Sequence, residues 1–318
     1  MNQRSERGET RAAYGEALME LGGRRSDVVV LDADLYNSTR TVHFAQAWPD
    51  RFFDMCIAEQ DMVSTAAGLA ASGLVPFCNS FAIFLTGRCY DQIRTQVAYP
   101  ALPVKLVGSS AGLTFGADGA THQALEDLAL MRALPNMTVL VPADGIEAYQ
   151  ATLAAAELPG PVYVRLGRYP VPRVVPEDYQ FVPGRPTVLR AGTDVTLLAT
   201  GHMVWKTLEA AELLASCDRL EACVVNVSTL KPLDGPAVLG LCRGAQAVFT
   251  IEEHSIIGGL GSAVAEILAD AGVGVPLRRL GVADRFGESG TPEELLARHG
   301  LQPVQIQAAV IALLSEAK

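Results

Sequence analysis

The sequence predicts an α/β fold with two domains, a doubly wound, mostly parallel sheet followed by a smaller α/β domain. Two observations support this prediction. Short apolar strand patterns alternate with helical patterns along most of the 318 residues, which is typical of parallel sheets covered by helices on both faces. A proline-rich segment then divides the chain, because residues 170–186 contain five prolines, and proline interrupts both helices and strands.

The first half supplies the elements of the larger sheet. Helices are expected over residues 10–21, 60–72, 87–97, 122–134 and 145–156. Strands are expected over residues 28–31, 75–78, 104–107, 138–141 and 162–166, where apolar residues cluster. We assign residues 1–169 to this first domain and expect its site at the carboxyl ends of the strands.

Residues 170–187 are interpreted as a linker and residues 188–318 as the second domain. Strands over residues 195–199, 222–227 and 247–251 alternate there with helices near residues 202–216 and 261–271. The glycines at 258, 259 and 261 begin the last of these helices but lack the third glycine of a dinucleotide-binding fingerprint. We interpret them as a sign of tight helix packing.

Composition and charge argue against several classes of partner. The formal net charge is -10 without a cluster of Lys or Arg, which disfavours nucleic-acid binding. Apolar stretches are broken well short of a membrane span, and the N-terminus lacks the apolar segment of an export signal. The six cysteines form no C-x-x-C pair and are interpreted as reduced thiols. We expect a cytoplasmic protein that binds neither nucleic acid nor a membrane.

Common catalytic motifs are missing from the sequence. The five histidines are scattered, so no metal site is expected in this chain. The glycine-rich residues 108–116 lack the G-K-[ST] ending of a phosphate-binding P-loop, and there is no G-x-S-x-G nucleophile motif.

Three groups of residues remain near the ends of the expected strands. Glu59 stands where a strand end meets a helix of small residues. Asp118 and His122 bring a carboxylate and an imidazole close together at the expected start of a helix. Phe81 and Phe84 flank a loop and are able to sandwich a flat ring.

Longer segments resemble a known family. They are IAEQDMVSTAAGLAASGLVPF, SFAIFLTGRCYDQIR, GLTFGADGATHQALEDLALMRALPNMTVLVPAD, VNVSTLKPLD and TIEEHSIIGGLG. In this order they resemble the C-terminal half of transketolases over nearly the whole chain. The resemblance implies a thiamine-diphosphate pyrimidine-binding domain followed by a transketolase C-terminal domain.

The resemblance also implies how the cofactor is bound. Glu59 matches the glutamate that hydrogen-bonds a ring nitrogen of the aminopyrimidine and manages its proton. Phe81 and Phe84 match aromatic residues that pack on that ring. Asp34 and Leu35 match positions close to the cofactor.

A sugar-phosphate pocket is implied by five further matches. Arg11, Ser38 and Arg168 match residues of the phosphate clamp, in which guanidinium groups bind a phosphate bidentately. Asp118 and His122 match the pair that hydrogen-bonds substrate hydroxyls, with His122 also catalytic near the donor's carbonyl.

Two positions depart from the family pattern. Gly87 stands where many transketolases carry a third aromatic residue, which implies a thinner stacking wall. Ser110 stands where typical transketolases place a histidine in the substrate channel, which puts the usual donor in doubt.

One expected part of a transketolase has no match in the chain. Across this superfamily a separate domain with a G-D-G motif and a downstream asparagine holds the diphosphate and its divalent ion. The resemblance therefore implies that Mg²⁺ or another divalent ion is held by a partner, the N-terminal transketolase subunit, in an α₂β₂ heteromer. It implies transfer of a two-carbon ketol unit from a ketose phosphate to an aldose phosphate.

Three alternatives stay open. The β subunit of a 2-oxoacid dehydrogenase E1 component shares the split architecture and the glutamate but would lack the D-G-A-T-H-Q segment. 1-deoxyxylulose-phosphate synthase shares that segment and an R-x-Y-D-Q motif like the one beginning at Arg88, but is a single long chain. A regulatory paralogue is disfavoured by the joint presence of Glu59, Asp118 and His122.

Overall fold

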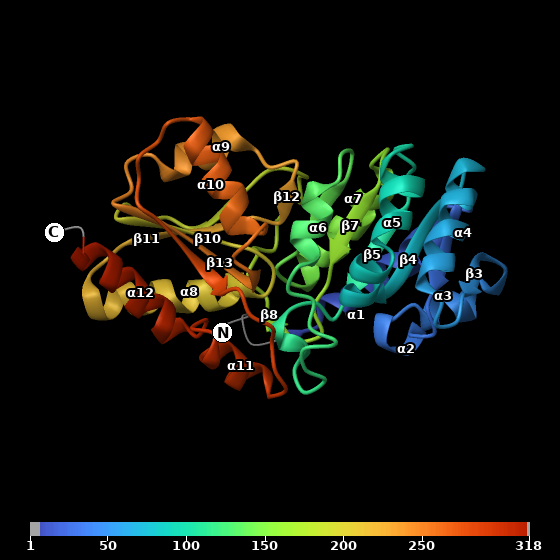
Figure 1. Ribbon diagram of the computed structural model, residues 1–318, viewed down its shortest axis with the longest axis horizontal. Coiled ribbons are helices and arrows are strands. Elements are labelled where there is room, and N and C mark those ends of the chain that lie inside the picture. Colours follow the sequence, from blue (N-terminus) through green and yellow to red (C-terminus); the bar gives the residue numbers. More distant parts are fainter. Residues whose placement is uncertain (1–6, 317–318) are drawn as a thin grey trace.

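The computed structural model describes residues 7–316, which form two large sheets, each covered by helices on both faces (Figure 1), and a third sheet of only two short strands. The larger sheet consists of β2 (Val28–Asp32), β3 (Phe52–Asp54), β4 (Val75–Phe81), β5 (Lys105–Ser109), β6 (Thr138–Leu140), β7 (Val162–Arg165) and β12 (Thr229–Lys231). Their spatial order is β12-β6-β7-β5-β4-β2-β3. All pairs are parallel except β12 with β6.

Alternating side chains of each buried strand face the two helical layers. Val28 and Val30 belong to a core cluster with α1 (Thr10–Arg24) and α7 (Gly145–Glu157). Val29 and Leu31 belong to the opposite cluster, with α4 (Glu59–Ala71), η4 (Ile93–Ala98) and α6 (Asp127–Ala133). Because strand residues point alternately to the two faces, a strand such as β2, which is apolar from Val28 to Leu31, requires both layers.

The smaller sheet has the order β14-β13-β10-β11-β9. Its strands are β9 (Thr187–Arg190), β10 (Val195–Ala199), β11 (Ala222–Asn226), β13 (Ala247–Ser255) and β14 (Leu277–Val282). Its helices are α8 (Met203–Leu213), η6 (Leu214–Asp218), α9 (Gly235–Cys242), α10 (Leu260–Asp270), α11 (Pro292–Arg298) and α12 (Pro303–Glu316). Only β9 runs antiparallel to its neighbour among these described strands. The predicted fold of two mostly parallel α/β units is confirmed.

The two halves share backbone pairing and core. β12 comes from the second half and forms an antiparallel edge of the larger sheet. β1 (Arg7–Gly8) pairs with β8 (Val171–Pro172), inside the expected linker. Side chains of α6 and α10 lie in one hydrophobic cluster. The boundaries 1–169, 170–187 and 188–318 stay a prediction.

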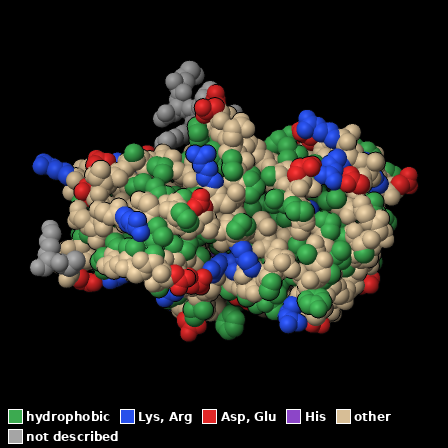
Figure 2. Space-filling model, turned by 90° about the horizontal axis from the view of Figure 1, so that it is seen from above, with side chains coloured by type: hydrophobic (Ala, Val, Ile, Leu, Met, Phe, Trp, Pro, Cys, Tyr) green, Lys and Arg blue, Asp and Glu red, His purple; other side chains and the backbone are tan. Residues whose placement is uncertain are grey.

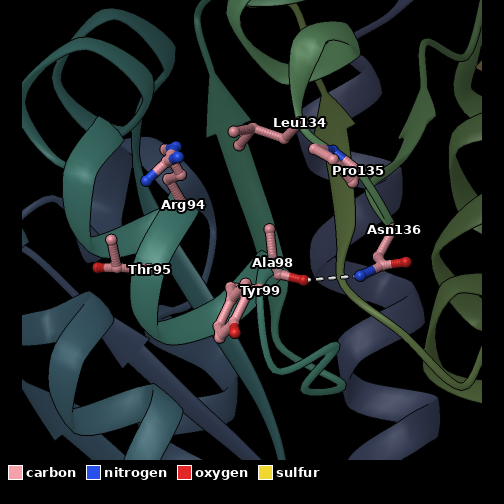
Figure 3. A pocket seen from close by; sticks show the side chains of 7 residues that line it. All are labelled: Arg94, Thr95, Ala98, Tyr99, Leu134, Pro135 and Asn136. Atoms are coloured by element: carbon pink, nitrogen blue, oxygen red, sulfur yellow. Dashed lines mark hydrogen bonds between the residues drawn. The ribbon is translucent and has the colours of Figure 1, made fainter.

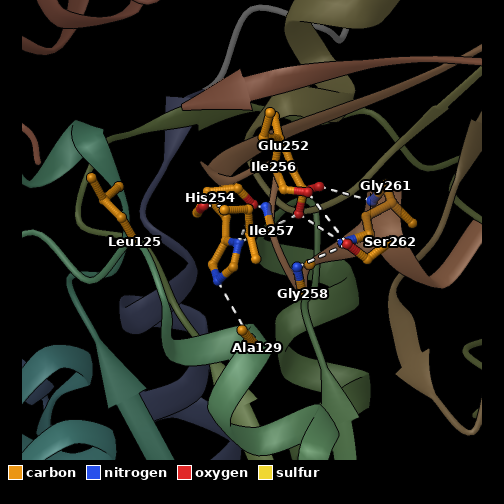
Figure 4. A network of polar contacts seen from close by, with 12 residues as sticks. Leu125, Ala129, Glu252, His254, Ile256, Ile257, Gly258, Gly261 and Ser262 are labelled. Atoms are coloured by element: carbon orange, nitrogen blue, oxygen red, sulfur yellow. Dashed lines mark hydrogen bonds and ion pairs between the residues drawn. The ribbon is translucent and has the colours of Figure 1, made fainter. Parts of the chain in front are cut away.

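The glycine run before α10 packs closely, as predicted. A Cβ on Gly258 would lie 2.4 Å from the Cβ of Ala129, and one on Gly261 would lie 2.7 Å from Arg279. The buried Glu252 carboxylate accepts hydrogen bonds from the amides of Leu260 and Gly261 at the start of α10 (Figure 4). Gly258 therefore allows close approach at the boundary between the two halves, and Gly261 allows it within the second half.

Two expected helices differ from the structure. The helix expected over 122–134 begins only at Asp127, since the amides of His122 and Gln123 both donate to the carbonyl of Gly119, which has a φ of +75°. The helix expected over 87–97 begins earlier, as the π-helical turn η3 (Phe84–Arg88), and continues through α5 (Tyr90–Gln92) and η4. Two short helices, α2 (Tyr36–Thr39) and α3 (Val42–Ala47), were not expected.

Within residues 7–316, no helix is both long and apolar enough to cross a membrane. On the face shown in Figure 2, Lys and Arg side chains are interspersed with Asp and Glu.

Candidate active site

The candidate residues gather along the carboxyl edge of the larger sheet, where parallel α/β folds bind their ligands. Five of its seven strands contribute from the segment at or after their ends: Asp34 and Leu35 for β2, Glu59 for β3, Phe81 and Phe84 for β4, Asp118 and His122 for β5, and Arg168 for β7.

Three phenylalanine rings and one imidazole form the centre of this site. The ring centroid of Phe81 lies 6.1 Å from Phe84 and 5.1 Å from Phe115. The imidazole of His122 lies 5.2 Å from Phe84 and 5.6 Å from Phe115. The structure thus brings three of the predicted residues together. Phe115 was missed, although its place inside the glycine-rich loop was a signal available in the sequence.

Glu59 is a buried carboxylate at the start of α4, with 2% of its surface exposed. The helix N-terminus stabilises its negative charge. Arg88 Nη1 donates to Glu59 Oε2 over 2.7 Å, and the Arg88 guanidinium lies 4.7 Å from the centroid of the Phe84 ring. Arg88 was not predicted as a site residue, and the η3 turn is what places it beside Glu59.

The contacts of Arg88 indicate which kind of chemical group fits beside Glu59 and Phe84. A guanidinium is flat and rich in N–H groups, and here it lies over an aromatic ring while it donates to a buried carboxylate. An aminopyrimidine is also flat, and its ring nitrogen can share a proton with a carboxyl group, so Glu59 and Phe84 fit such a ring. A Cβ on Gly87 would meet no atom within 4 Å, so the space beside it is open.

The loop after β2 is held by a buried carboxylate that was not predicted. Asp32 Oδ1 accepts the amide of Leu35 over 2.7 Å, and its other oxygen accepts two threonine hydroxyls. Burial raises the pKa of Asp32 to about 6 against the opposing effect of these hydrogen bonds. Asp34 is exposed with a φ of +60°, and its amide donates to Asp54 over 3.2 Å.

Arg11 and Ser38 meet, but through the backbone of Ser38. Arg11 Nη1 donates to the Ser38 carbonyl over 2.9 Å, and Nη2 and Nε donate to the two carboxylate oxygens of Glu9. Arg40 also donates to Glu9, over 2.8 Å. Burial acts to raise the pKa of Glu9, but hydrogen bonds from these two arginines and their charges outweigh burial and lower this pKa. The guanidinium of Arg11 is therefore already neutralised by a residue that was not predicted.

Arg168 is the more accessible of the two predicted phosphate ligands. Its Nη1 lies 3.8 Å from Asp118 Oδ2, with both side chains about half exposed. Its guanidinium lies 5.8 Å from the Phe115 ring. Thr10 Oγ1 donates to the Gly167 carbonyl and accepts from the Gly167 amide, which holds the start of α1 against this loop.

The remaining polar groups are defined by local contacts. His122 Nδ1 lies 2.9 Å from the hydroxyl of Thr121. Ser110 is fully buried with a φ of +56°, a strained conformation that is often found at functional sites. In residues 7–316, no group of three or more His, Cys, Asp or Glu side chains is arranged to hold a metal ion.

A separate cavity of about 450 Å³ lies near the amino ends of β5 and β6, away from this site. It lies between η4 and the segment after α6 (Figure 3), and its lining residues are Arg94, Thr95, Ala98, Tyr99, Leu134, Pro135 and Asn136. None of the predicted site residues lines this cavity.

Comparison with known families identifies the chain. Residues 7–173 match the family described as "Transketolase, pyrimidine binding domain", and residues 184–306 match "Transketolase, C-terminal domain". The chain belongs to the transketolase family. This confirms the predicted order of a pyrimidine-binding domain and a transketolase C-terminal domain, in a family that depends on thiamine diphosphate.

Several relatives of this transketolase-family chain have similar lengths. A putative transketolase C-terminal section of Methanocaldococcus jannaschii is 44% identical over 95% of both chains. The 6-deoxy-6-sulfo-D-fructose transketolase subunit SqwH of Clostridium sp. is 44% identical, over 94% of this chain and 92% of its own. A 1-deoxy-D-xylulose-5-phosphate synthase of Pelotomaculum thermopropionicum is 39% identical over 94% of this chain, which spans only 47% of that enzyme.

Solved transketolase structures share the fold. One described as "Split gene transketolase, inactive beta4 tetramer" is 50% identical, has a TM-score of 0.89, and is matched over 96% of this chain and 98% of its own. A transketolase from Campylobacter jejuni, 23% identical, has a TM-score of 0.83 over 98% of this chain and 48% of its own.

Proposed function

We propose that this chain is the C-terminal subunit of a two-subunit, thiamine-diphosphate-dependent transketolase. It transfers a two-carbon ketol unit from a ketose phosphate to an aldose phosphate when a partner subunit is bound. The observation that carries the proposal is the buried Glu59, joined through Arg88 to the Phe84 ring, at the carboxyl edge of a pyrimidine-binding domain. Relatives of similar length, described as a transketolase C-terminal section and a transketolase subunit, support it.

Thiamine diphosphate, when bound, supplies the carbanion-stabilising centre on which ketol transfer depends. Glu59, which accepts a hydrogen bond from Arg88 in this structure, would hydrogen-bond a pyrimidine nitrogen with its carboxyl group. Because this side chain is buried, water would be kept from the proton that it exchanges with the ring. Phe81 and Phe84 orient the ring by packing on its faces. Asp34 and Leu35 border the same edge of the sheet.

The partner is the N-terminal transketolase subunit, which supplies the groups that bind the diphosphate and Mg²⁺. We propose an α₂β₂ assembly with its active sites at the interfaces. The 50% identical split-gene transketolase is described as inactive as a tetramer of β chains, which supports the need for a second subunit. We also propose a cytoplasmic location, with which the six free cysteines are compatible.

Arg168 is the principal phosphate ligand in this proposal, since Glu9 already engages Arg11. Asp118 and His122 bind substrate hydroxyls, and Ser38 contributes to the pocket beside Arg11. A phosphate that approaches Arg168 competes with Asp118, so Asp118 is free to turn toward a hydroxyl once the phosphate is bound.

Replacing His122 by Ala is expected to lower kcat/KM of the reconstituted enzyme by roughly 10²–10³-fold, because a positioned acid–base group is lost. The control is His43→Ala, which removes an exposed histidine of α3. Initial rates at varied donor concentration measure the effect. If the two variants have the same kcat/KM, His122 has no role in the reaction.

The substrate class is tested with the two mixed chains, thiamine diphosphate and Mg²⁺. We expect a ketose phosphate and an aldose phosphate to exchange two carbons, visible as product masses. Consumption of a 2-oxoacid alone would instead indicate an E1 component.

A second candidate is a 1-deoxyxylulose-5-phosphate-synthase-like reaction. The 39% identical synthases and the motif that begins at Arg88 favour it. In the same assay, it would appear as condensation of pyruvate with glyceraldehyde phosphate and release of carbon dioxide.

A further inference from the structure

The C-terminal half contributes none of the candidate site residues, yet it contacts the loop that carries Asp118 and His122. We call residues 112–123 the substrate loop. It begins just after β5, includes the short helix η5 (Leu113–Phe115), and lies between the larger sheet and the second half of the chain.

Glu253 of β13 holds the beginning of this loop. Its Oε2 accepts a hydrogen bond from the Thr114 amide over 3.0 Å and another from the Thr114 hydroxyl over 2.8 Å. A Cβ on Gly112, where φ is +83°, would lie 2.4 Å from the Glu253 side chain. The loop backbone therefore approaches this carboxylate as closely as glycine alone permits.

Glu253 is buried, with 2% of its surface exposed, and is well suited to remain charged. Burial acts to raise its pKa, but hydrogen bonds from His202 and Thr114 and the charge of Arg165 outweigh this and lower it. His202 Nδ1 lies 3.3 Å from Glu253 Oε1, and Arg165 Nη2 donates to the Glu253 carbonyl over 3.2 Å. Hydrogen bonds to such a carboxylate are stronger than those between neutral groups.

A second contact holds the end of the loop. Gln123 Nε2 donates to the Glu288 carbonyl over 2.9 Å and to the loop's own Gly116 carbonyl over 3.1 Å. A Cβ on Gly119 would lie 2.6 Å from Ser289 Oγ. Helix α11 packs against η5 from the same side.

The consequence for the site passes through Phe115. This residue follows Thr114 directly. The centroid of its ring lies 5.6 Å from the centroid of the His122 ring and 5.8 Å from the Arg168 guanidinium. A shift of η5 would therefore move the residues that bind substrate, while Glu59 and Phe84 stand on other elements.

We propose that Glu253, acting through Thr114, is a positioning residue by which the C-terminal half fixes the substrate loop for sugar binding. The proposal rests on the proposed function. The neighbouring Glu252 has a different task, since it accepts amides at the start of α10 (Figure 4).

The test uses Thr114→Val and Glu253→Gln, separately and combined. Two variants serve as controls. Thr114→Ser keeps the hydroxyl. Glu266→Gln removes a carboxylate of α10 that pairs with Arg132 across the same boundary over 2.9 Å.

In the reconstituted enzyme, Thr114→Val and Glu253→Gln should each raise KM for the sugar substrates about tenfold. A tenfold change corresponds to about 1.4 kcal/mol of binding free energy, which is comparable to the loss of one hydrogen bond. We expect kcat and the half-saturating thiamine diphosphate concentration to change by less than about threefold. The double variant should raise KM by less than the product of the two single effects, because both changes weaken the hydrogen bond between the Thr114 hydroxyl and the Glu253 carboxylate.

Amide hydrogen exchange of the isolated chain gives a readout that needs no activity. The exchange rate of residues 112–123 should rise in Thr114→Val and Glu253→Gln but not in the two controls. The exchange rate of α6 should stay unchanged in all four variants. Unchanged exchange in the loop, KM values equal to those of Glu266→Gln, or a rise that extends through α6 would each overturn the proposal. If the wild-type mixture transfers no ketol unit, the proposed function fails, whereas loop exchange still tests the Glu253 contact.

Discussion

Glu59→Gln is expected to lower kcat of the reconstituted enzyme by roughly 10²–10⁴-fold, the range lost when a general acid–base group is removed. Glutamine preserves the shape of the side chain and can still hydrogen-bond a ring nitrogen, but it cannot take up or release the proton. Because Glu59 is buried, solvent has little access to take over its proton transfer. Steady-state rates at saturating cofactor measure the loss.

Asp61→Asn provides the matched control. Asp61 lies in the same first turn of α4 but is exposed, so it shares the favourable position at the helix N-terminus without facing the site. Its replacement should leave kcat within about twofold. If Glu59→Gln and Asp61→Asn behaved alike, Glu59 would be a helix-stabilising residue and the proposed mechanism would be wrong.

The second large effect is the dependence of cofactor binding on the partner. The isolated chain should bind thiamine diphosphate roughly 10²–10⁴-fold more weakly than the complex. Loss of two charge-assisted contacts to the diphosphate costs about 3–6 kcal/mol. Isothermal titration of the chain, the partner and their mixture, each with Mg²⁺, measures this difference. Equal affinity of the isolated chain and the mixture would show that this chain alone completes the cofactor site.

Much of the fold could be predicted because the spacing of apolar residues indicates whether a helix or strand is buried on one face or on both. The strand expected over residues 195–199 is β10, and the helix expected over 145–156 is α7 with one residue more. The start of α6 could not be predicted in this way. Residues 122–126 continue a helical pattern, but hydrogen bonds to Gly119 and the contact of Gln123 with Glu288 keep them out of the helix.

The site was predicted in part for a similar reason. Residues that act on a ligand belong to recognisable segments, and the structure places Glu59, Phe84 and His122 on one edge of the sheet. Residues that act on other residues give no such signal. Arg88 reaches Glu59 because of the π-helical turn, and Glu253 reaches Thr114 from 139 positions away. Such contacts depend on tertiary packing, which a single sequence does not specify.

A titration of ketol transfer tests most directly whether this chain is half of a transketolase. The chain is held at fixed concentration with thiamine diphosphate, Mg²⁺, a ketose phosphate and an aldose phosphate, while the N-terminal subunit is added stepwise. We expect no transfer without the partner, and a rate that rises and saturates at one partner per chain. Full-rate transfer by the chain alone would contradict the claim.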